Sequence, residues 1–248
     1  MNNNFYNQIT LLKDMISKSK NIVAFTGAGI SVPSGIPDFR SSTGLYKTET
    51  NGSFPPEYML SHSCFVNQTS DFYKFYKGKM IYKNAKYNLG HKWLKQLEDD
   101  NKLSCVITQN IDGLHYQAGS KNVFEFHGSI YRNYCQKCHK YYDLDYIINS
   151  DNIPKCEVCG GVIKPDVVLY EEGLDEDIVQ GSINAVMHAD MLIVIGTSLV
   201  VYPAASLIDY FKGKYLVLIN KSSTNYDNNA DLVINEDITK VAKEMLEK

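Results

Sequence analysis

Two Cys-x-x-Cys pairs constrain the fold of this chain more than any other feature of its sequence. Cys135 and Cys138 form the first pair, and Cys156 and Cys159 follow after 17 intervening residues. This spacing is typical of zinc sites, in which four thiolates meet on one Zn²⁺. Disulfides are the alternative, but the chain shows no export signal. Because four thiolates leave no open coordination position, the zinc is predicted to be structural, and the chemistry must lie elsewhere.

The composition allows a well-packed core and argues against polyanionic partners. The chain has 248 residues, 44% of them hydrophobic, which suits one large domain or one domain with an insertion. Its net charge of −3 argues against nucleic acid as a partner. The N-terminus lacks the pattern of a secretory signal, and the most apolar stretch, residues 191–205, is too interrupted to span a membrane. We therefore expect a cytoplasmic monomer without a membrane partner.

Short apolar runs separated by helical patterns predict an open α/β sheet. Buried strands are expected at 21–27, 103–108, 166–170, 191–196, 215–220 and 231–235, with a weaker and more exposed candidate at 123–128. Their lack of strict alternation suits a parallel sheet that is covered on both faces. Helices are expected near the N-terminus, at 89–102 and from Pro203 to Gly213. Ligands of such sheets bind beyond the carboxyl ends of the strands.

Two segments interrupt this alternation and predict a smaller second lobe. Residues 41–87 are polar and aromatic-rich, and residues 129–165 hold the four cysteines. We expect one catalytic domain over 1–248, with a Rossmann-like part at about 1–40, 88–128 and 166–248. The small lobe would then combine a helical insert at 41–87 with a zinc module at 129–165.

A glycine turn follows the first predicted strand. Gly27 and Gly29 would let backbone amides and the start of a following helix approach phosphates. The pattern alone is weak, because ordinary tight turns also use it. The third glycine of a dinucleotide fingerprint is missing, and so is an acidic residue about 20 positions on. A hydride-transferring dehydrogenase is therefore poorly supported.

Three further polar groups are candidate site residues, and each has a plainer alternative. Asp38, Phe39 and Arg40 stand in a row, and a solvated loop would also explain them. Gln109, Asn110 and Asp112 follow a strand, where they could equally cap a helix. His127 precedes Gly128 at the end of an extended segment. A lone histidine is more often structural, but it is also the natural general base near neutral pH.

Taken together in order, these motifs resemble the sirtuin family of NAD-dependent protein deacylases over nearly the whole chain. The motifs are "GAGIS" (27–31), "GIPDFR" (35–40), "TQNID" (108–112), "HG" (127–128), the two cysteine pairs and "GTSL" (196–199). The resemblance implies an α/β domain that binds NAD, a structural zinc, and acyl-lysine proteins or peptides as substrates. The acyl group would pass from lysine to ADP-ribose as nicotinamide leaves.

The resemblance also implies a role for each site residue. His127 would be the base, and Asn110 and Asp112 would hold the nicotinamide and its ribose. Peptide contacts would come from Val167, Val168 and Tyr170, with the backbone of 164–170 pairing with the peptide as a strand. The remaining NAD contacts would be Gly27, Ala28, Gly29, Asp38, Phe39, Arg40, Gln109, Ile111, Gly196, Thr197, Ser198, Asn220 and Ile238.

Two departures from the family pattern bear on the substrate. Glu171 replaces a glycine that is frequent in the family, and an acidic residue there would weakly favour basic peptides. Members that remove succinyl groups carry a Tyr-x-x-Arg pair, which aligns with Tyr73 and Tyr76. Without that guanidinium, neutral acyl groups, acetyl first, are expected to be preferred over succinyl. The alternative is that Lys74 or Lys77 compensates. The alternatives are ADP-ribosyl transfer or NAD hydrolysis on the same scaffold, and a zinc-containing adaptor without catalysis.

Overall fold

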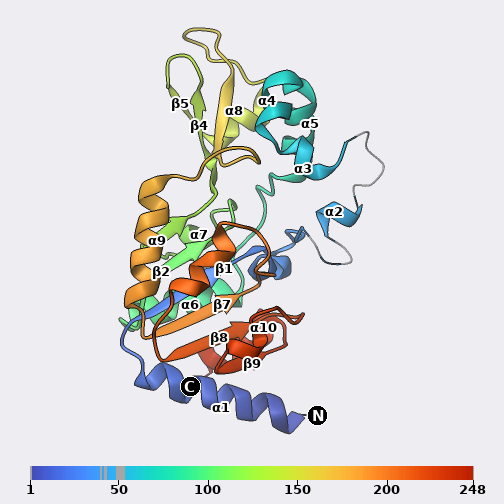
Figure 1. Cartoon of the computed structure of the whole chain (residues 1–248). Helices are drawn as coiled ribbons and strands as arrows, with labels where there is room; N and C mark the ends of the chain where they lie inside the picture. Colours follow the sequence, from blue (N-terminus) through green and yellow to red (C-terminus); the bar gives the residue numbers. More distant parts are fainter. Residues whose placement is uncertain (1, 40, 42–43, 49–53, 248) are drawn as a thin grey trace.

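A parallel six-stranded sheet forms the lower part of the protein in Figure 1. In this computed structural model, the described residues are 2–39, 41, 44–48 and 54–247. The strand order is β3-β2-β1-β7-β8-β9, so the order reverses at β1, which lies between β2 and β7. The strands are β1 (Ile22–Thr26), β2 (Leu103–Thr108), β3 (Val123–Glu125), β7 (Met191–Ile195), β8 (Tyr215–Ile219) and β9 (Leu232–Ile234).

Alternate residues of the strands enter two separate cores. Ile22 and Ala24 pack in a cluster with α1 (Asn2–Lys18), α6 (Leu89–Asp99) and α10 (Ile238–Leu246). Val23 and Phe25 pack in a second cluster, with α9 (Glu176–His188) and the 3-10 helix η3 (Ala204–Tyr210). Every residue of β1 and β7 is buried, which explains why these strands lack an alternating pattern in the sequence.

A smaller lobe lies above the parallel sheet in Figure 1. Its antiparallel sheet has the order β5-β4-β6, with β4 (Gly128–Cys135), β5 (Tyr141–Tyr142) and β6 (Ile163–Val167). The helices around it are α3 (Pro56–Met59), α4 (His62–Asn67), α5 (Thr69–Lys79) and α8 (Leu144–Asn149). Phe65, Phe72, Tyr73 and Tyr76 form the aromatic centre of its core. Two short helices belong to loops, α2 (Leu45–Thr48) and α7 (Leu114–Gln117).

Three predictions from the sequence are wrong in detail. The expected strand at 166–170 is not part of the parallel sheet, because β6 ends at Val167 and pairs antiparallel with β4. The glycine turn leads into two 3-10 helices, η1 (Ala28–Ile30) and η2 (Val32–Ser34), rather than a regular helix. Gly35, in the left-handed conformation, ends η2. The helix expected from Pro203 is the 3-10 helix η3.

The amphipathic N-terminal helix and the weaker strand within 123–128 are confirmed as α1 and the edge strand β3. Among the residues that the structure describes, no helix combines the length and apolar character that a membrane crossing requires.

Two buried histidines lie beside the end of β1. The rings of His91 and His115 are 4.8 Å apart between centroids, and His115 Nε2 is 3.1 Å from the Thr26 hydroxyl oxygen. His91 Nδ1 accepts the Asn88 backbone N–H. Burial lowers the pKa of His91 to about 4, and burial with the neighbouring His91 lowers the pKa of His115 well below its ordinary value.

This pair predicts a loss of stability in mild acid. Both imidazoles stay neutral in the folded protein, whereas in the unfolded chain they bind protons below about pH 6.5. The contribution of the two neutral histidines to the free energy of unfolding is therefore complete above that pH and falls as the pH decreases. For His91 the fall continues until about pH 4. Between about pH 7 and about pH 5.5 we expect a loss of roughly 2 to 3 kcal/mol for the two groups together.

Urea unfolding at these two pH values measures the effect. His115→Gln should be less stable at neutral pH but should show a shallower pH dependence, whereas His188→Ala, on the exposed end of α9, should keep the full slope. An unfolding midpoint that does not change between the two pH values would contradict the prediction.

Candidate active site

A cavity of about 690 Å³ is lined by residues of both the parallel-sheet part and the small lobe. It lies at the carboxyl ends of β1, β2 and β7, as expected for an open α/β sheet. The predicted site residues that line it are Gly27, Ala28, Gly29, Asp38, Phe39, Tyr76, Gln109, Asn110, Ile111, Asp112, His127, Val167, Val168, Tyr170, Gly196, Thr197, Ser198, Asn220 and Ile238. Arg40 lies outside the described residues, and Tyr73 is not part of the lining.

The loops after β1 and β7 are in direct contact at this cavity. The Gly29 backbone N–H donates to the Gly196 carbonyl at 2.8 Å, and a Cβ added at Gly29 would lie 2.6 Å from Gly196 Cα. Only glycines allow this approach. Most amides of the 27–31 turn bond within the protein, and among the described residues only the Ala28 N–H of this turn is without a partner. Ala28 is therefore the one amide of the turn that is free to meet a ligand.

A polar cluster joins the first and second loops. Ser31 donates to Asp112 Oδ2 at 2.6 Å, and Asn110 Nδ2 lies 3.1 Å from both the Gly27 carbonyl oxygen and Ser31 Oγ. Asp112 Oδ1 also accepts the Leu114 backbone N–H at 2.9 Å. Burial raises the pKa of Asp112, while the bond from Ser31 opposes that rise. Asp112 thus accepts a backbone N–H at the start of α7 and also lines the cavity. Its partner Ser31 belongs to "GAGIS", but the sequence alone does not indicate this contact.

His127 is held with one nitrogen available for chemistry. Its Nδ1 lies 2.9 Å from the Gln109 carbonyl oxygen. A carbonyl can only accept, so Nδ1 carries the proton and Nε2 keeps a lone pair. Burial lowers the pKa of His127, which keeps the imidazole neutral at pH 7. A neutral imidazole with a free lone pair can act as a general base.

The loops after β7 and β8 form the other end of the cavity. Asn220 Nδ2 donates to the Thr197 carbonyl at 3.0 Å, and Gln109 Nε2 donates to the Thr197 hydroxyl at 3.0 Å. Both Asn220 and Thr197 are buried. Glu236 also lines this end, beside the predicted Ile238. These amides and hydroxyls are the groups that sugar hydroxyls bind.

The loop after η2 contributes Asp38 and Phe39. Asp38 Oδ1 accepts the Ser41 backbone N–H at 3.0 Å, which shapes the turn. The Phe39 ring meets the Tyr46 ring edge-to-face, with centroids 5.5 Å apart. The Tyr46 hydroxyl in turn contacts the Tyr170 hydroxyl across the cavity lining. Tyr46 could not be identified from the sequence, because its partner is distant along the chain.

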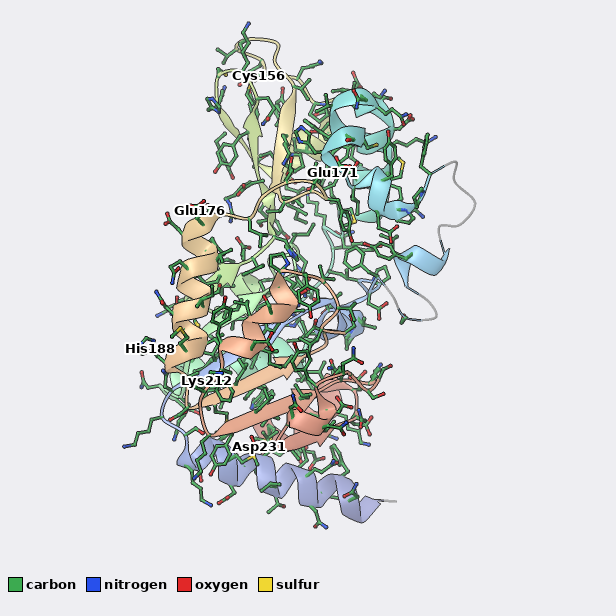
Figure 2. All side chains as sticks on the ribbon, viewed as in Figure 1. Cys156, Glu171, Glu176, His188, Lys212 and Asp231 are labelled. Carbon is green, nitrogen blue, oxygen red and sulfur yellow. The ribbon has the colours of Figure 1, made fainter. Side chains whose placement is uncertain are left out.

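The segment expected to bind peptide is already bonded on part of its backbone. The Val168 N–H donates to the His127 carbonyl at 3.0 Å, and the Tyr170 N–H donates to the Leu60 carbonyl. Glu171 has φ of 73°, the left-handed conformation that favours glycine. Its carboxylate accepts the Ser63 backbone N–H at 2.9 Å, so it caps α4. Figure 2 shows Glu171 beside the helices of the small lobe. Its effect on basic peptides stays a prediction.

The two tyrosines of the predicted acyl pocket are core residues of the small lobe. Tyr73 is fully buried, and its hydroxyl bonds to the Ile163 carbonyl. Tyr76 is fully buried and stacks on Phe72, and its hydroxyl is also buried, without a hydrogen-bond partner among the described residues. Tyr76 lines the cavity, and Lys79 and Met80 from the end of the same helix line it as well.

The four cysteines lie together at the far end of the small lobe, where Figure 2 labels Cys156. Their sulfur atoms are all within 4.8 Å of one another, and Cys135 and Cys159 are 3.4 Å apart. Four thiolates at about 2.3 Å from one metal ion would be separated by about 3.8 Å, so the cluster fits tetrahedral Zn²⁺.

Comparison with known proteins assigns the family. The Sir2 family model matches residues 27–203. A relative from Clostridium acetobutylicum, named NAD-dependent protein deacetylase, is 60% identical over 96% of this chain and 98% of its own. One from Staphylococcus epidermidis, with the same name, is 46% identical over 96% of each chain. A Sir2 structure with deacetylated p53 peptide and 3′-O-acetyl ADP ribose has a TM-score of 0.90 and 37% identity, covering 96% of this chain and 97% of its own.

A second Sir2 structure, with p53 peptide and NAD⁺, has a TM-score of 0.84 and 38% identity over 96% of this chain and 97% of its own. The chain belongs to the Sir2 family.

Proposed function

We propose that this protein is an NAD-dependent protein-lysine deacetylase that transfers the acyl group to ADP-ribose and releases nicotinamide. The observation that carries the proposal is His127, a neutral imidazole fixed by the Gln109 carbonyl in the same cavity as Asn110 and Asp112. The relatives named NAD-dependent protein deacetylase cover nearly the whole chain and support it. Acyl-lysine proteins or peptides are the substrates.

The lining of the cavity fits the dinucleotide. The partnerless Ala28 N–H suits a phosphate, and the amides of Asn110, Gln109 and Asn220 suit nicotinamide and sugars. When bound, NAD supplies a ribose carbon that takes the acyl oxygen as nicotinamide leaves. His127 Nε2 would take a proton from a ribose hydroxyl, so that the hydroxyl oxygen can attack the acyl carbon. Addition of water would then release the lysine amine and leave the acyl group on ADP-ribose. The Phe39 ring excludes water from the reacting centre.

Each remaining group has a part in this scheme. Asp112, held by Ser31, orients the nicotinamide half, while Thr197 and Ser198 orient the adenosine half with Ile238. Val167, Val168 and Tyr170 contact the peptide. Cys135, Cys138, Cys156 and Cys159 would hold one Zn²⁺, which supplies cross-links for the small lobe and no chemistry.

Mass spectrometry of one reaction tests the proposal. Purified protein, NAD and an acetyl-lysine peptide should yield deacetylated peptide and O-acetyl-ADP-ribose only when NAD is present. Nicotinamide release with a peptide that is unchanged, or that gains ADP-ribose, would instead indicate NAD hydrolysis or ADP-ribosyl transfer. No consumption of NAD by the folded, zinc-loaded protein would contradict the proposal.

Tyr76, which lines the cavity where a Tyr-x-x-Arg pair would place its arginine, predicts selectivity for neutral acyl groups. A succinyl carboxylate buried there without a guanidinium would lose its hydration, at a cost of several kcal/mol. We expect kcat/KM for an acetyl peptide to exceed that for the matching succinyl peptide by at least about 100-fold. Comparable values for the two peptides would contradict the prediction. An effect on KM alone would place the selectivity in binding.

The compartment, assembly state and limits of the lobes are further proposals. Cysteines in oxidising compartments usually form disulfides, so a cluster of four zinc-binding cysteines supports a cytoplasmic protein. A monomer without nucleic-acid or membrane partners is proposed, and light scattering of the purified protein tests the monomer. We also propose a Rossmann-like part at about 1–40, 88–128 and 166–248, with the rest as the small lobe. The strand β6 crosses the boundary at 165.

A further inference from the structure

Arg132 joins the two lobes through ion pairs that the proposed mechanism does not use. Its Nη1 donates to Glu125 Oε2, and its Nε donates to Asp166 Oδ2 at 2.7 Å. Glu125 is the last residue of β3, in the parallel sheet, whereas Arg132 and Asp166 lie on β4 and β6 of the small-lobe sheet. One guanidinium therefore connects the end of the large sheet to two strands of the small one.

The burial of Glu125 makes this contact more than a surface ion pair. The side chain of Glu125 is 8% exposed, and Arg132 is the cation that offsets the desolvation of its carboxylate. Asp166 is the second carboxylate of the group. Without the guanidinium, two acidic side chains would face one another, one of them buried without a counter-charge. Only the planar fork of arginine can bond both carboxylates at once.

His127 lies on the short link that this contact brackets. Phe126 and His127 alone separate Glu125 from Gly128, where β4 begins. The His127 carbonyl accepts the Val168 N–H at 3.0 Å, two residues after Asp166. Gly128 has φ of 77°, and a Cβ there would lie 2.0 Å from the Asp166 carbonyl oxygen. The backbone on both sides of His127 is thus placed by Glu125 and by the 166–168 segment, and Arg132 holds these two together.

We propose that Arg132 is a positioning residue for His127, which fixes the imidazole in the cavity by holding Glu125 and Asp166 at once. The inference rests on the proposed function, because it concerns the proposed general base. A base acts only within hydrogen-bond reach of its proton, and a displacement of about 1 Å can reduce the rate about 100-fold.

The first test separates the release of nicotinamide from the later acyl transfer, in which His127 takes a proton. Arg132→Met should lower kcat for deacetylation by roughly 10- to 100-fold, with little change in KM for NAD or peptide. Exchange of labelled nicotinamide into NAD, in the presence of acetyl peptide, should persist, because nicotinamide leaves before His127 takes a proton. Arg132→Lys should recover part of kcat, since lysine can pair with one carboxylate at a time.

A matched control removes an ion pair of the small lobe whose two residues do not line the cavity. Lys83 pairs with Asp145, and both side chains are more than half exposed. Lys83→Met should therefore keep kcat, KM and nicotinamide exchange at their original values.

The second test reads the imidazole itself, without NAD. Nitrogen-15 NMR of histidine-labelled protein should show His127 as the Nδ1–H tautomer in the original chain. In Arg132→Met we expect a mixture of tautomers and a titration midpoint shifted toward 6.5, as the ring becomes exposed. If Arg132→Met fails to fold, Asp166→Asn removes one arm of the contact and should show smaller changes of the same kind.

Two results would overturn the inference. One is an unchanged kcat and tautomer in Arg132→Met. The other is an equal loss of deacetylation and nicotinamide exchange with raised KM values, which would indicate a role in folding of the lobes only. If the original chain shows no NAD-dependent deacetylation, the proposed function fails by itself, and the tautomer measurement still decides whether Arg132 positions His127.

Discussion

Replacing His127 with alanine is expected to lower kcat for deacetylation by about 10²- to 10⁴-fold, the usual contribution of a general base. His127 Nδ1 donates to the Gln109 carbonyl, which leaves the imidazole with a lone pair at Nε2. Nicotinamide exchange should survive in His127→Ala, because the base acts after nicotinamide has left. Steady-state kinetics with an acetyl peptide and an exchange assay with labelled nicotinamide measure the two stages.

The control for this variant is another histidine. His188 ends α9 and is exposed, as Figure 2 shows for its labelled side chain at the edge of the molecule. His188→Ala should retain the original kcat. Circular dichroism and zinc content should match among the three proteins. If His127→Ala deacetylated at the original rate, another group would have to be the base, and the assignment of the site would be wrong.

Removal of the metal is expected to unfold the small lobe and to abolish activity. Zinc contributes about 10 to 16 kcal/mol to the folding of small peptides that bind it through cysteine and histidine, far more than the aromatic core of this lobe could replace. We expect one zinc per chain by elemental analysis. Chelation, or Cys156→Ser, should make residues 128–167 sensitive to protease and stop deacetylation. This segment begins directly after His127, and Val168, directly after its end, donates to the His127 carbonyl.

Cys105 provides the matched control. It is buried on β2 in the second core cluster, away from the four-cysteine site. Cys105→Ala should keep its zinc and its activity, and should lose only about 1 kcal/mol of stability, a typical value for a point substitution. A Cys156→Ser protein with full activity and no zinc would contradict the structural role of the metal.

Patterns local in sequence allowed much of this fold to be predicted. The buried runs at β1, β2, β7, β8 and β9 are long enough and apolar enough to identify a parallel sheet, and the cysteine spacing identified the metal cluster. The strand at 166–170 was misplaced because a run of valines fits either sheet. The pairing partner decides which sheet the strand joins. Val167 pairs with Gly128, and no pattern in the sequence near either residue indicates this pairing.

The site could be predicted where its motifs follow a strand, and not where its contacts join residues that are distant in the sequence. Asn110, Asp112 and His127 follow strands, so the carboxyl-end rule finds them. Ser31 was missed as a partner of Asp112, and Tyr46 as a partner of Tyr170, because these bonds join residues that are far apart in the chain. A single sequence carries no signal for such pairs beyond the presence of polar side chains.

The position of β1 at the middle of the sheet has a consequence for how the chain is made. Ile22 pairs with Met191 on one side and with Leu103 on the other, so the first strand to leave the ribosome waits for most of the chain before its second neighbour arrives. The small-lobe sheet, by contrast, closes within residues 128–167 and could assemble earlier. During that interval the apolar edge of β1 is open to pairing with other nascent chains. Chaperones that bind the nascent chain early should therefore raise the yield of native protein, whereas slower translation, which lengthens this interval, should lower it.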